Sequence, residues 1–260
     1  MLSDGEPIYR TLAGLMKVEP DEESVGRELC EMLKLEAMIG VAASGKFTFA
    51  ISGGSMLKML SDLADDDSIE WSKCTMAFVS HRCLPLDDEG STYGKALPKF
   101  LQSWINRGLT VIAPGGTTDA EAEAEAYEAA LSSNVASDAD GYPSFDMAMI
   151  GVGMDGHVGS IYPNIPDVES TRAVVPITGV DGMGKVSTKL SLSLRSMLAS
   201  KTCVVACAGK SAKAPLGKAQ AMVRALEAEG ETPMTFPACA LREKATWLLD
   251  EDTAALLSRD

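Results

Sequence analysis

The sequence lacks the features that several large classes of protein require. Its 260 residues include two histidines, and its six cysteines form no C-x-x-C pair, which argues against a zinc site or a disulfide framework. No run approaches the roughly eighteen apolar residues of a membrane-spanning helix. The N-terminus has no basic stretch followed by an apolar one, so we expect no secretory signal and a soluble, cytoplasmic protein. The cysteines are expected to be buried free thiols.

Positive charge is also scarce. The chain has 23 Lys and Arg against 37 Asp and Glu, a formal net charge of −14. Such a protein is not attracted to nucleic acids or anionic membranes, and we expect neither as a partner. An anionic ligand would have to be held by donors gathered in one place, such as arginines, lysines or a helix N-terminus.

Short apolar runs alternate with helical patterns from residue 46 onward. No internal repeat, composition break or low-complexity linker interrupts them, so we predict one domain over residues 1–260. The alternation predicts an α/β fold with a mostly parallel sheet flanked by helices. The strand at 185–194 alternates strictly and should be half-exposed, with Val186, Thr188, Leu190, Leu192 and Leu194 on one face. Other strands are expected at 46–51, 74–80, 109–114, 145–153 and 201–209 and early in 244–257, with helices in 52–67, 117–134 and 213–230 and a short one at the end of 244–257.

Ligands of open parallel sheets bind at the carboxyl ends of the strands. After the first of these strands comes "ISGGS" (51–55), where Gly53 and Gly54 would let the backbone approach a ligand closely. Ser55 could cap a helix that starts at Met56, and the N–H groups there could hold a phosphate. A simple tight turn with a serine cap explains the same residues equally well. The lack of G-K-[ST] excludes a P-loop.

A second loop, "SHRCLPLDDEGSTYG" (80–94), contains His81 and Arg82 just after a strand. Arginine binds phosphate or carboxylate groups in a bidentate manner, so Arg82 is a candidate ligand-binding residue. The alternative is a surface arginine that pairs with Asp87 or Asp88.

The third loop, "GVGMDGHVGS" (151–160), has the G-x-G-x-x-G spacing of a dinucleotide-binding loop. That function needs a long helix directly after the glycines and an acidic residue at the end of the next strand. Pro163 and Pro166 exclude a long helix, and the next strand candidate, "TRAVVPI", ends without an acid. We therefore expect no nucleotide cofactor.

The same loop presents His157 close to Asp155 and Ser160. A histidine after a glycine turn is often structural. Here, however, a carboxylate two residues away could orient the imidazole or raise its basicity. The sequence therefore favours a catalytic loop built around His157.

These segments resemble the 6-phosphogluconolactonase family. "FDMAMIGVGMDGHVGSIYP" is similar to a signature in which an apolar strand leads into G-x-G-x-D-G-H-x-x-S-x-F-P. "ISGGS" resembles the family's phosphate-loop turn, "HRCLPLDDEGSTYG" its D-E-R-x-V-P loop, and "KVSTKLSLSL" its R-V-T-L-T-L-P strand. "VVACAGKSAKAPL" resembles its later strand and G-x-x-K segment. The resemblance runs in order over residues 47–257.

The resemblance implies hydrolysis of 6-phospho-D-glucono-1,5-lactone to 6-phosphogluconate in the oxidative pentose phosphate pathway. The implied fold is the modified Rossmann-like α/β architecture of glucosamine-6-phosphate deaminases and ribose-5-phosphate isomerases. It also implies no metal and no cofactor, with a phosphorylated sugar lactone as the small-molecule partner, and we expect a monomer. The implied catalytic residues are His157 and Asp155, and the implied substrate-binding residues are Gly53, Gly54, Ser55, Arg82, Gly156, Ser160 and Lys213, with Lys210 as a competitor for Lys213.

The chain departs from the family at 80–82, where "SHR" replaces the common D-E-R. The resemblance places Ser80 where the deaminase and isomerase relatives have a proton-abstracting carboxylate. His81 is then either a second base or a spectator. Two other functions stay open on the same fold: a non-catalytic sugar-phosphate-binding protein, and a sugar-phosphate deaminase or isomerase.

Overall fold

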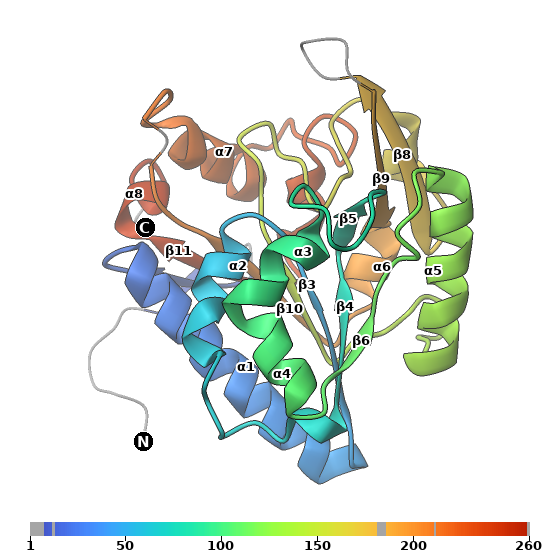
Figure 1. Ribbon diagram of the computed structural model, residues 1–260. Helices are drawn as coiled ribbons and strands as arrows, with labels where there is room; N and C mark the ends of the chain where they lie inside the picture. The colour runs from blue at the N-terminus through green and yellow to red at the C-terminus, as the bar shows by residue number, and fades with distance from the viewer. Residues whose placement is uncertain (1–7, 12–13, 181–185, 211, 259–260) are drawn as a thin grey trace.

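The computed structural model describes residues 8–11, 14–180, 186–210 and 212–258 (Figure 1). Within them, an eight-stranded sheet has the order β1-β2-β11-β10-β7-β3-β4-β6. Only β1 and β2 pair in the antiparallel sense, and the other pairs are parallel. The mostly parallel sheet is therefore confirmed. Its strands are β1 (Ile8–Thr11), β2 (Gly14–Glu19), β3 (Phe47–Ile51), β4 (Cys74–Phe78), β6 (Thr110–Ile112), β7 (Met147–Ile150), β10 (Thr202–Cys207) and β11 (Thr246–Asp250).

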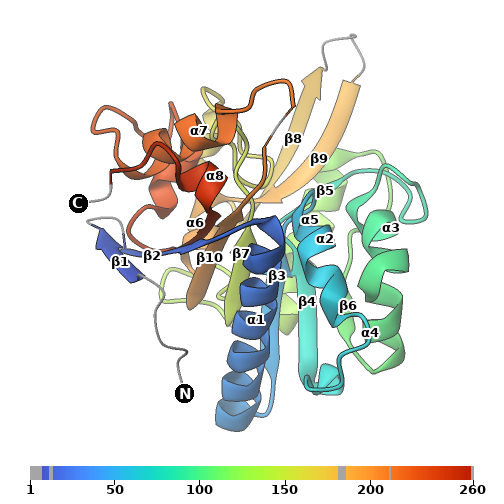
Figure 2. The same ribbon diagram turned by 90° about the vertical axis from the view of Figure 1, so that its left-hand side faces the viewer.

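Helices cover both faces of this sheet, as Figures 1 and 2 show. One face carries α1, α2, α3 and α4, and the other carries α5, α6 and α7. In the described part of the chain no helix is both long and apolar enough to span a bilayer. The helices are α1 (Glu22–Ser44), α2 (Met56–Met59), α3 (Thr92–Ala96), α4 (Gln102–Asn106), α5 (Ala120–Asn134), α6 (Leu194–Leu198), α7 (Gly217–Leu226) and α8 (Glu251–Ala254).

The central strand β7 shows how the sequence produces these layers. Successive side chains of a strand point to opposite faces. Met147 and Met149 accordingly join the core beneath α1 and α2, whereas Ala148 and Ile150 join the core beneath α5 and α7. All four side chains are fully buried, as predicted from the apolarity of 145–153.

The first helix, α1, was not predicted although its sequence has a clear helical stripe. Val25, Leu29 and Leu33 recur every four residues and are fully buried. The Asp21 side chain accepts a hydrogen bond from the backbone of the first turn, and Gly45 ends the helix with φ of 77°.

A second sheet, also unpredicted, stands beside the first. It is antiparallel and consists of β5 (Ser80–Arg82), β9 (Val186–Leu192) and β8 (Val174–Val180), in that order. The prediction of one apolar face for 185–194 was wrong: β9 begins exposed at Val186 but ends with Leu190, Ser191 and Leu192 all buried. The predicted run also ended too late, because Leu194 belongs to α6.

Val79 joins the two sheets. Its N–H donates to the carbonyl of Ile51 in β3 at 2.8 Å, and its own carbonyl accepts from the N–H of Leu192 in β9 at 2.8 Å. The chain thus passes from β4 into β5 at a residue that is hydrogen-bonded to β3 on one side and to β9 on the other. This junction places the second sheet at the carboxyl ends of the central parallel strands.

The cysteines behave largely as expected. All six are free, and five are buried. Cys239 is half-buried, so the expectation of burial fails there.

Candidate active site

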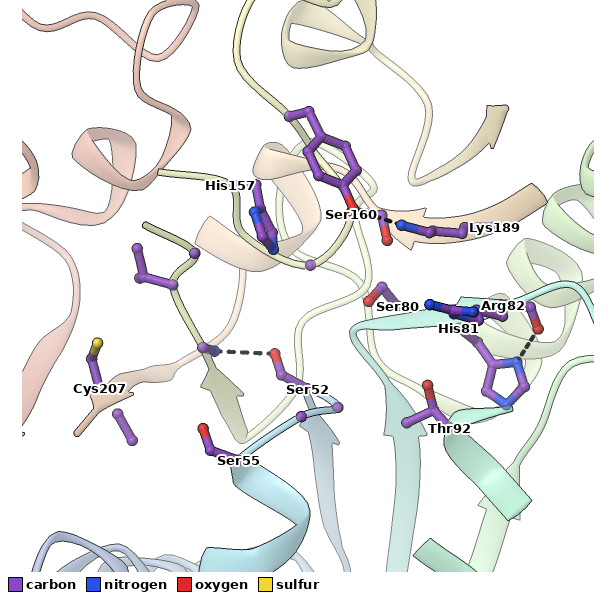
Figure 3. Close-up of a pocket in the computed structure, with 18 of the residues that line it drawn as sticks. Ser52, Ser55, Ser80, His81, Arg82, Thr92, His157, Ser160, Lys189 and Cys207 are labelled. Atoms are coloured by element: carbon purple, nitrogen blue, oxygen red, sulfur yellow. Dashed lines mark hydrogen bonds between the residues drawn. The ribbon is translucent and has the colours of Figure 1, made fainter. Parts of the chain in front are cut away.

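A cleft of about 300 Å³ lies between the carboxyl ends of the central strands and the second sheet (Figure 3). Three walls can be distinguished: the turn after β3, the loop after β7, and the strands β5 and β9. Of the predicted site residues, Gly53, Gly54, Ser55, Arg82, His157 and Ser160 line it. Asp155 and Gly156 lie in the same loop as His157 without lining the cleft. Its other lining residues are Ser52, Ser80, His81, Thr92, Gly151, Val152, Gly153, Gly159, Tyr162, Lys189, Ala206, Cys207 and Lys218.

His157 and Asp155 form a hydrogen-bonded pair. Nδ1 of His157 donates to Oδ1 of Asp155 at 2.6 Å, and the same oxygen accepts the His157 backbone N–H at 3.2 Å. Burial raises the pKa of Asp155, but the charge and hydrogen bonds of His157 outweigh it, so this pKa lies below its usual value. The ionised carboxylate therefore orients the imidazole. With the proton on Nδ1, the Nε2 lone pair is available, and the side chain is 33% exposed to solvent.

Two glycines of the loop are required by close contacts, Gly153 by this pair and Gly156 by Phe236. A Cβ on Gly153 would lie 2.1 Å from Nδ1 of His157, and one on Gly156 would lie 2.5 Å from the ring of Phe236. Gly156 also has φ of 87°, which favours glycine. The next helical segment is a short 3₁₀ helix at Pro166–Glu169. The glycine spacing thus serves the approach of the imidazole, and the loop lacks the helix N-terminus on which dinucleotide loops place a pyrophosphate.

The turn after β3 offers unused donors. Within the described residues, the backbone N–H groups of Gly53, Gly54 and Ser55 have no hydrogen-bond acceptor. The predicted serine cap was wrong: Ser55 already has helical dihedral angles (φ −62°, ψ −27°), and its side chain makes no capping hydrogen bond. Its hydroxyl faces the cleft instead (Figure 3). Because α2 has a single turn before it tightens into a 3₁₀ helix, these donors act as individual N–H and O–H groups.

Arg82 lies on the opposite wall. Its side chain is exposed, and among the described residues no carboxylate pairs with it, so the pairing with Asp87 or Asp88 is absent. Lys189 of β9 stands directly across from it in the antiparallel register. Nζ of Lys189 donates to the hydroxyl of Tyr162 at 2.6 Å.

His81 is a structural histidine. It is buried, its Nδ1 donates to the carbonyl of Arg82 at 2.6 Å, and its Nε2 accepts the N–H of Tyr93 at 3.0 Å. Burial lowers the pKa of His81 and so favours its neutral form. Since both ring nitrogens are engaged, His81 has none left for a substrate proton, which favours the spectator alternative.

The predicted lysine is not brought into the cleft. Lys213 is exposed in the turns before α7 and does not line the cavity, and Lys210 pairs with Asp252. Lys218, in the first turn of α7, lines the cavity and donates to the carbonyl of Ala208. The turns at 212–216 carry Lys213 outward and bring Lys218 back over the cleft.

Three residues that line the cleft were not predicted from the sequence: Tyr162, Lys189 and Lys218. The available signals were the tyrosine where the family signature has phenylalanine, a lysine inside an otherwise alternating strand, and a lysine at a helix start. Among the residues that the structure describes, no group of three or more His, Cys, Asp or Glu side chains could hold a metal ion.

The parallel sheet with helices on both faces, and a cleft at the carboxyl ends of its strands, are those of an α/β protein with a candidate ligand site at that edge. The chain belongs to the family described as glucosamine-6-phosphate isomerases/6-phosphogluconolactonase, whose model matches residues 20–249. The family resemblance drawn from the motifs is therefore confirmed.

Relatives named 6-phosphogluconolactonase have similar sequences. A 6-phosphogluconolactonase of Homo sapiens is 29% identical over 255 residues, covering 94% of each chain. One of Mycobacterium bovis is 31% identical over 230 residues, covering 84% of this chain and 87% of the relative.

Solved structures have the same fold. The 6-phosphogluconolactonase of Leishmania guyanensis superposes with a TM-score of 0.79 at 23% identity, over 95% of this chain and 99% of that one. The Trypanosoma brucei enzyme of that name also has a TM-score of 0.79, at 21% identity, over 97% and 100%. The modified Rossmann-like α/β architecture is thereby confirmed.

Proposed function

We propose that the chain hydrolyses 6-phospho-D-glucono-1,5-lactone to 6-phosphogluconate. The observation that carries the proposal is the His157–Asp155 pair in a solvent-accessible cleft of this family's fold. The shared name of the relatives indicates the lactone as substrate. The geometry supplies a base with a free nitrogen, an ionised residue that orients it, and donors for anionic groups.

His157 would act first as a general base. Its Nε2 takes a proton from water as the water oxygen bonds to C1, and the electron pair of the carbonyl bond moves onto the carbonyl oxygen. The imidazolium that forms is stabilised by Asp155. When the oxyanion re-forms the carbonyl, the bond from C1 to the ring oxygen breaks, and His157 returns the proton to that oxygen. The acid produced then ionises to the carboxylate.

Substrate binding is assigned by position in the cleft. Gly53, Gly54 and Ser55 supply N–H and hydroxyl donors, and Arg82 supplies a cation for an anionic group. Ser160 adds a hydroxyl beside the histidine loop, and Gly156 lets that loop turn. Lys213 stays a prediction without a place in the cleft, and Lys218 is the better-positioned lysine.

These steps consume no cofactor, because the only reactants are the lactone and water, and none of the roles proposed for the residues requires a metal ion. We further propose that the chain is a single-domain monomer that acts in the cytoplasm and binds neither nucleic acid nor membranes.

The test is substitution of His157 in an assay that follows acid release from freshly made lactone. His157→Ala should lower kcat by about 10²–10⁴, the usual contribution of a positioned acid–base group, with an unchanged melting temperature. His81 supplies no proton-transfer group, so no second histidine should rescue the variant. Near-normal turnover by a folded variant would overturn the mechanism.

The same purified protein can be used to distinguish the proposed hydrolysis from the two alternative functions. A sugar-phosphate-binding protein would bind 6-phosphogluconate but would not accelerate lactone hydrolysis. A deaminase would release ammonia from glucosamine 6-phosphate, which needs a carboxylate base where this chain has Ser80. We expect rapid hydrolysis and no ammonia.

A further inference from the structure

Two cations stand side by side on one wall of the cleft. Arg82 of β5 and Lys189 of β9 are directly opposite each other in the antiparallel register, and both line the cavity. Like charges in such positions destabilise a sheet unless an anion lies between them. Among the described residues, no carboxylate pairs with either side chain. The pair is therefore arranged for a negative charge that comes from outside the chain.

Tyr162 fixes the position of Lys189. The ammonium donates to the tyrosine hydroxyl at 2.6 Å and lies 4.8 Å from the centre of the ring. The same ring lies 4.8 Å, centre to centre, from the imidazole of His157. Lys189 is thus held one aromatic ring away from the proposed base.

We propose that Lys189, positioned by Tyr162, acts with Arg82 to bind the negative charge that builds on the C1 oxygens of the lactone. That charge is first the oxyanion formed when water adds to C1, and then the carboxylate of the product. The inference rests on the proposed function and assigns a further catalytic residue to it. Preorganised donors at a developing oxyanion are among the strongest contributions to catalysis.

The position of His157 decides which end of the substrate meets this wall. The attacking water must lie within hydrogen-bonding reach of Nε2, so C1 lies beside His157 and hence close to Tyr162 and Lys189. The phosphate is at the other end of the sugar. The other donors of the cleft form a different wall: the free N–H groups of residues 53–55 lie in the turn between β3 and α2, and the ammonium of Lys218 comes from α7. The C1 oxygens and the phosphate of the substrate thus meet two separate sets of hydrogen-bond donors.

The first experiment compares two substrates. Lys189→Met should lower kcat by about 10²-fold, as removal of one oxyanion donor does, with little change in KM. The loss should be equal for 6-phosphogluconolactone and for unphosphorylated glucono-1,5-lactone assayed at higher enzyme concentration. A loss confined to the phosphorylated lactone would instead place Lys189 at the phosphate and overturn the proposal, as would no loss. Lys99→Met is the matched control, because Lys99 is exposed on a helix outside the cleft.

Tyr162→Phe is the second variant. It keeps the ring beside His157 and removes only the hydroxyl, so the fold should be retained even if Lys189→Met is unstable. We expect a smaller fall in kcat, again equal for the two lactones. Unchanged kcat would show that Tyr162 does not position Lys189.

An equilibrium measurement separates this proposal from the proposed function. 6-Phosphogluconate and glucitol 6-phosphate share the phosphate but differ at C1, where only the first has a carboxylate. Lys189→Met should weaken the binding of 6-phosphogluconate about tenfold or more and leave glucitol 6-phosphate unchanged, as expected for loss of a charged hydrogen bond. Equal weakening of both ligands, or of neither, would contradict the proposal. Absence of lactone hydrolysis by the parent would overturn only the proposed function and the catalytic part of the inference.

Discussion

The two histidines of the chain differ in what their ring nitrogens contact. His157 uses Nδ1 for Asp155 and leaves Nε2 towards the cleft, whereas His81 uses both nitrogens for the backbone around it. A free nitrogen in a solvent-accessible side chain can move protons. A fully bonded and buried ring instead fixes the direction in which β5 presents Arg82.

The burial of His81 makes the stability of the protein depend on pH. Burial lowers its pKa below the ordinary value of 6.5, and the hydrogen bond to Arg82 and the charge of Glu123 only partly oppose this. Because its pKa is lower in the folded chain, the stability that neutral His81 contributes is complete above about pH 6.5 and is lost as the pH falls towards the folded value.

Comparison with His81→Gln isolates this contribution. Urea denaturation should show the parent more stable than the variant at pH 7.5, with the difference in unfolding free energy shrinking between pH 6.5 and 5.5. Carboxylate titrations are common to both proteins and cancel in the difference. A difference independent of pH would contradict the buried, neutral assignment.

Some residues of the site could be predicted from the sequence and others could not. His157, Asp155 and the glycines around them occupy consecutive positions, so their spacing already indicates their proximity. Lys189 meets Arg82 only through the pairing of β5 with β9, and it meets Tyr162 through a side-chain hydrogen bond to the loop after β7. Such contacts between distant segments cannot be read from local spacing. The family resemblance likewise implied Lys213, with Lys210 as a competitor, and did not indicate Lys218, which α7 carries into the cleft.

At the scale of elements, the conformation of the loop after β7 depends more on Gly153 than on Gly151. A Cβ at Gly153 would overlap the imidazole of His157, whereas a Cβ at Gly151 would meet no atom within 4 Å. Neither glycine has a positive φ, so alanine is compatible with the backbone at both positions.

Gly153→Ala should therefore displace the His157 ring and lower kcat by about 10²-fold, the typical cost of a misplacement near 1 Å. Gly230→Ala is the matched control and should retain most of the activity, because Gly230 lies outside the cleft and likewise has no positive φ and no atom within 4 Å of an added Cβ. Steady-state kinetics with melting temperatures for both variants would test this. Equal activities would mean that the loop absorbs the extra methyl group without moving the imidazole.

The sequence predicted the parallel strands from β3 onward because their apolar residues occupy both faces. It did not predict β5, whose three residues "SHR" carry no apolar periodicity and form a strand only because β9 pairs with them. α1 was not predicted either. Its apolar stripe at every fourth residue is present in the sequence, so the helix was predictable and the omission has no structural cause.

At the scale of the whole molecule, the two sheets that enclose the cleft are joined at Val79 by hydrogen bonds to both sides. No flexible linker separates them, so binding should not rotate one against the other. We expect saturating 6-phosphogluconate to change the radius of gyration in solution scattering by less than about 1 Å, the usual backbone shift of a preformed site. A larger contraction would show that the junction at Val79 bends.

The same junction bears on the type of chemistry that the cleft suits. Enzymes that transfer groups between substrates close a lid to keep solvent away from a reactive intermediate. Walls tied together at Val79 cannot close in that way, and the imidazole of His157 stays in contact with bulk solvent. Such a site suits a reaction in which water is itself a reactant, because each turnover draws its second substrate directly from the surroundings.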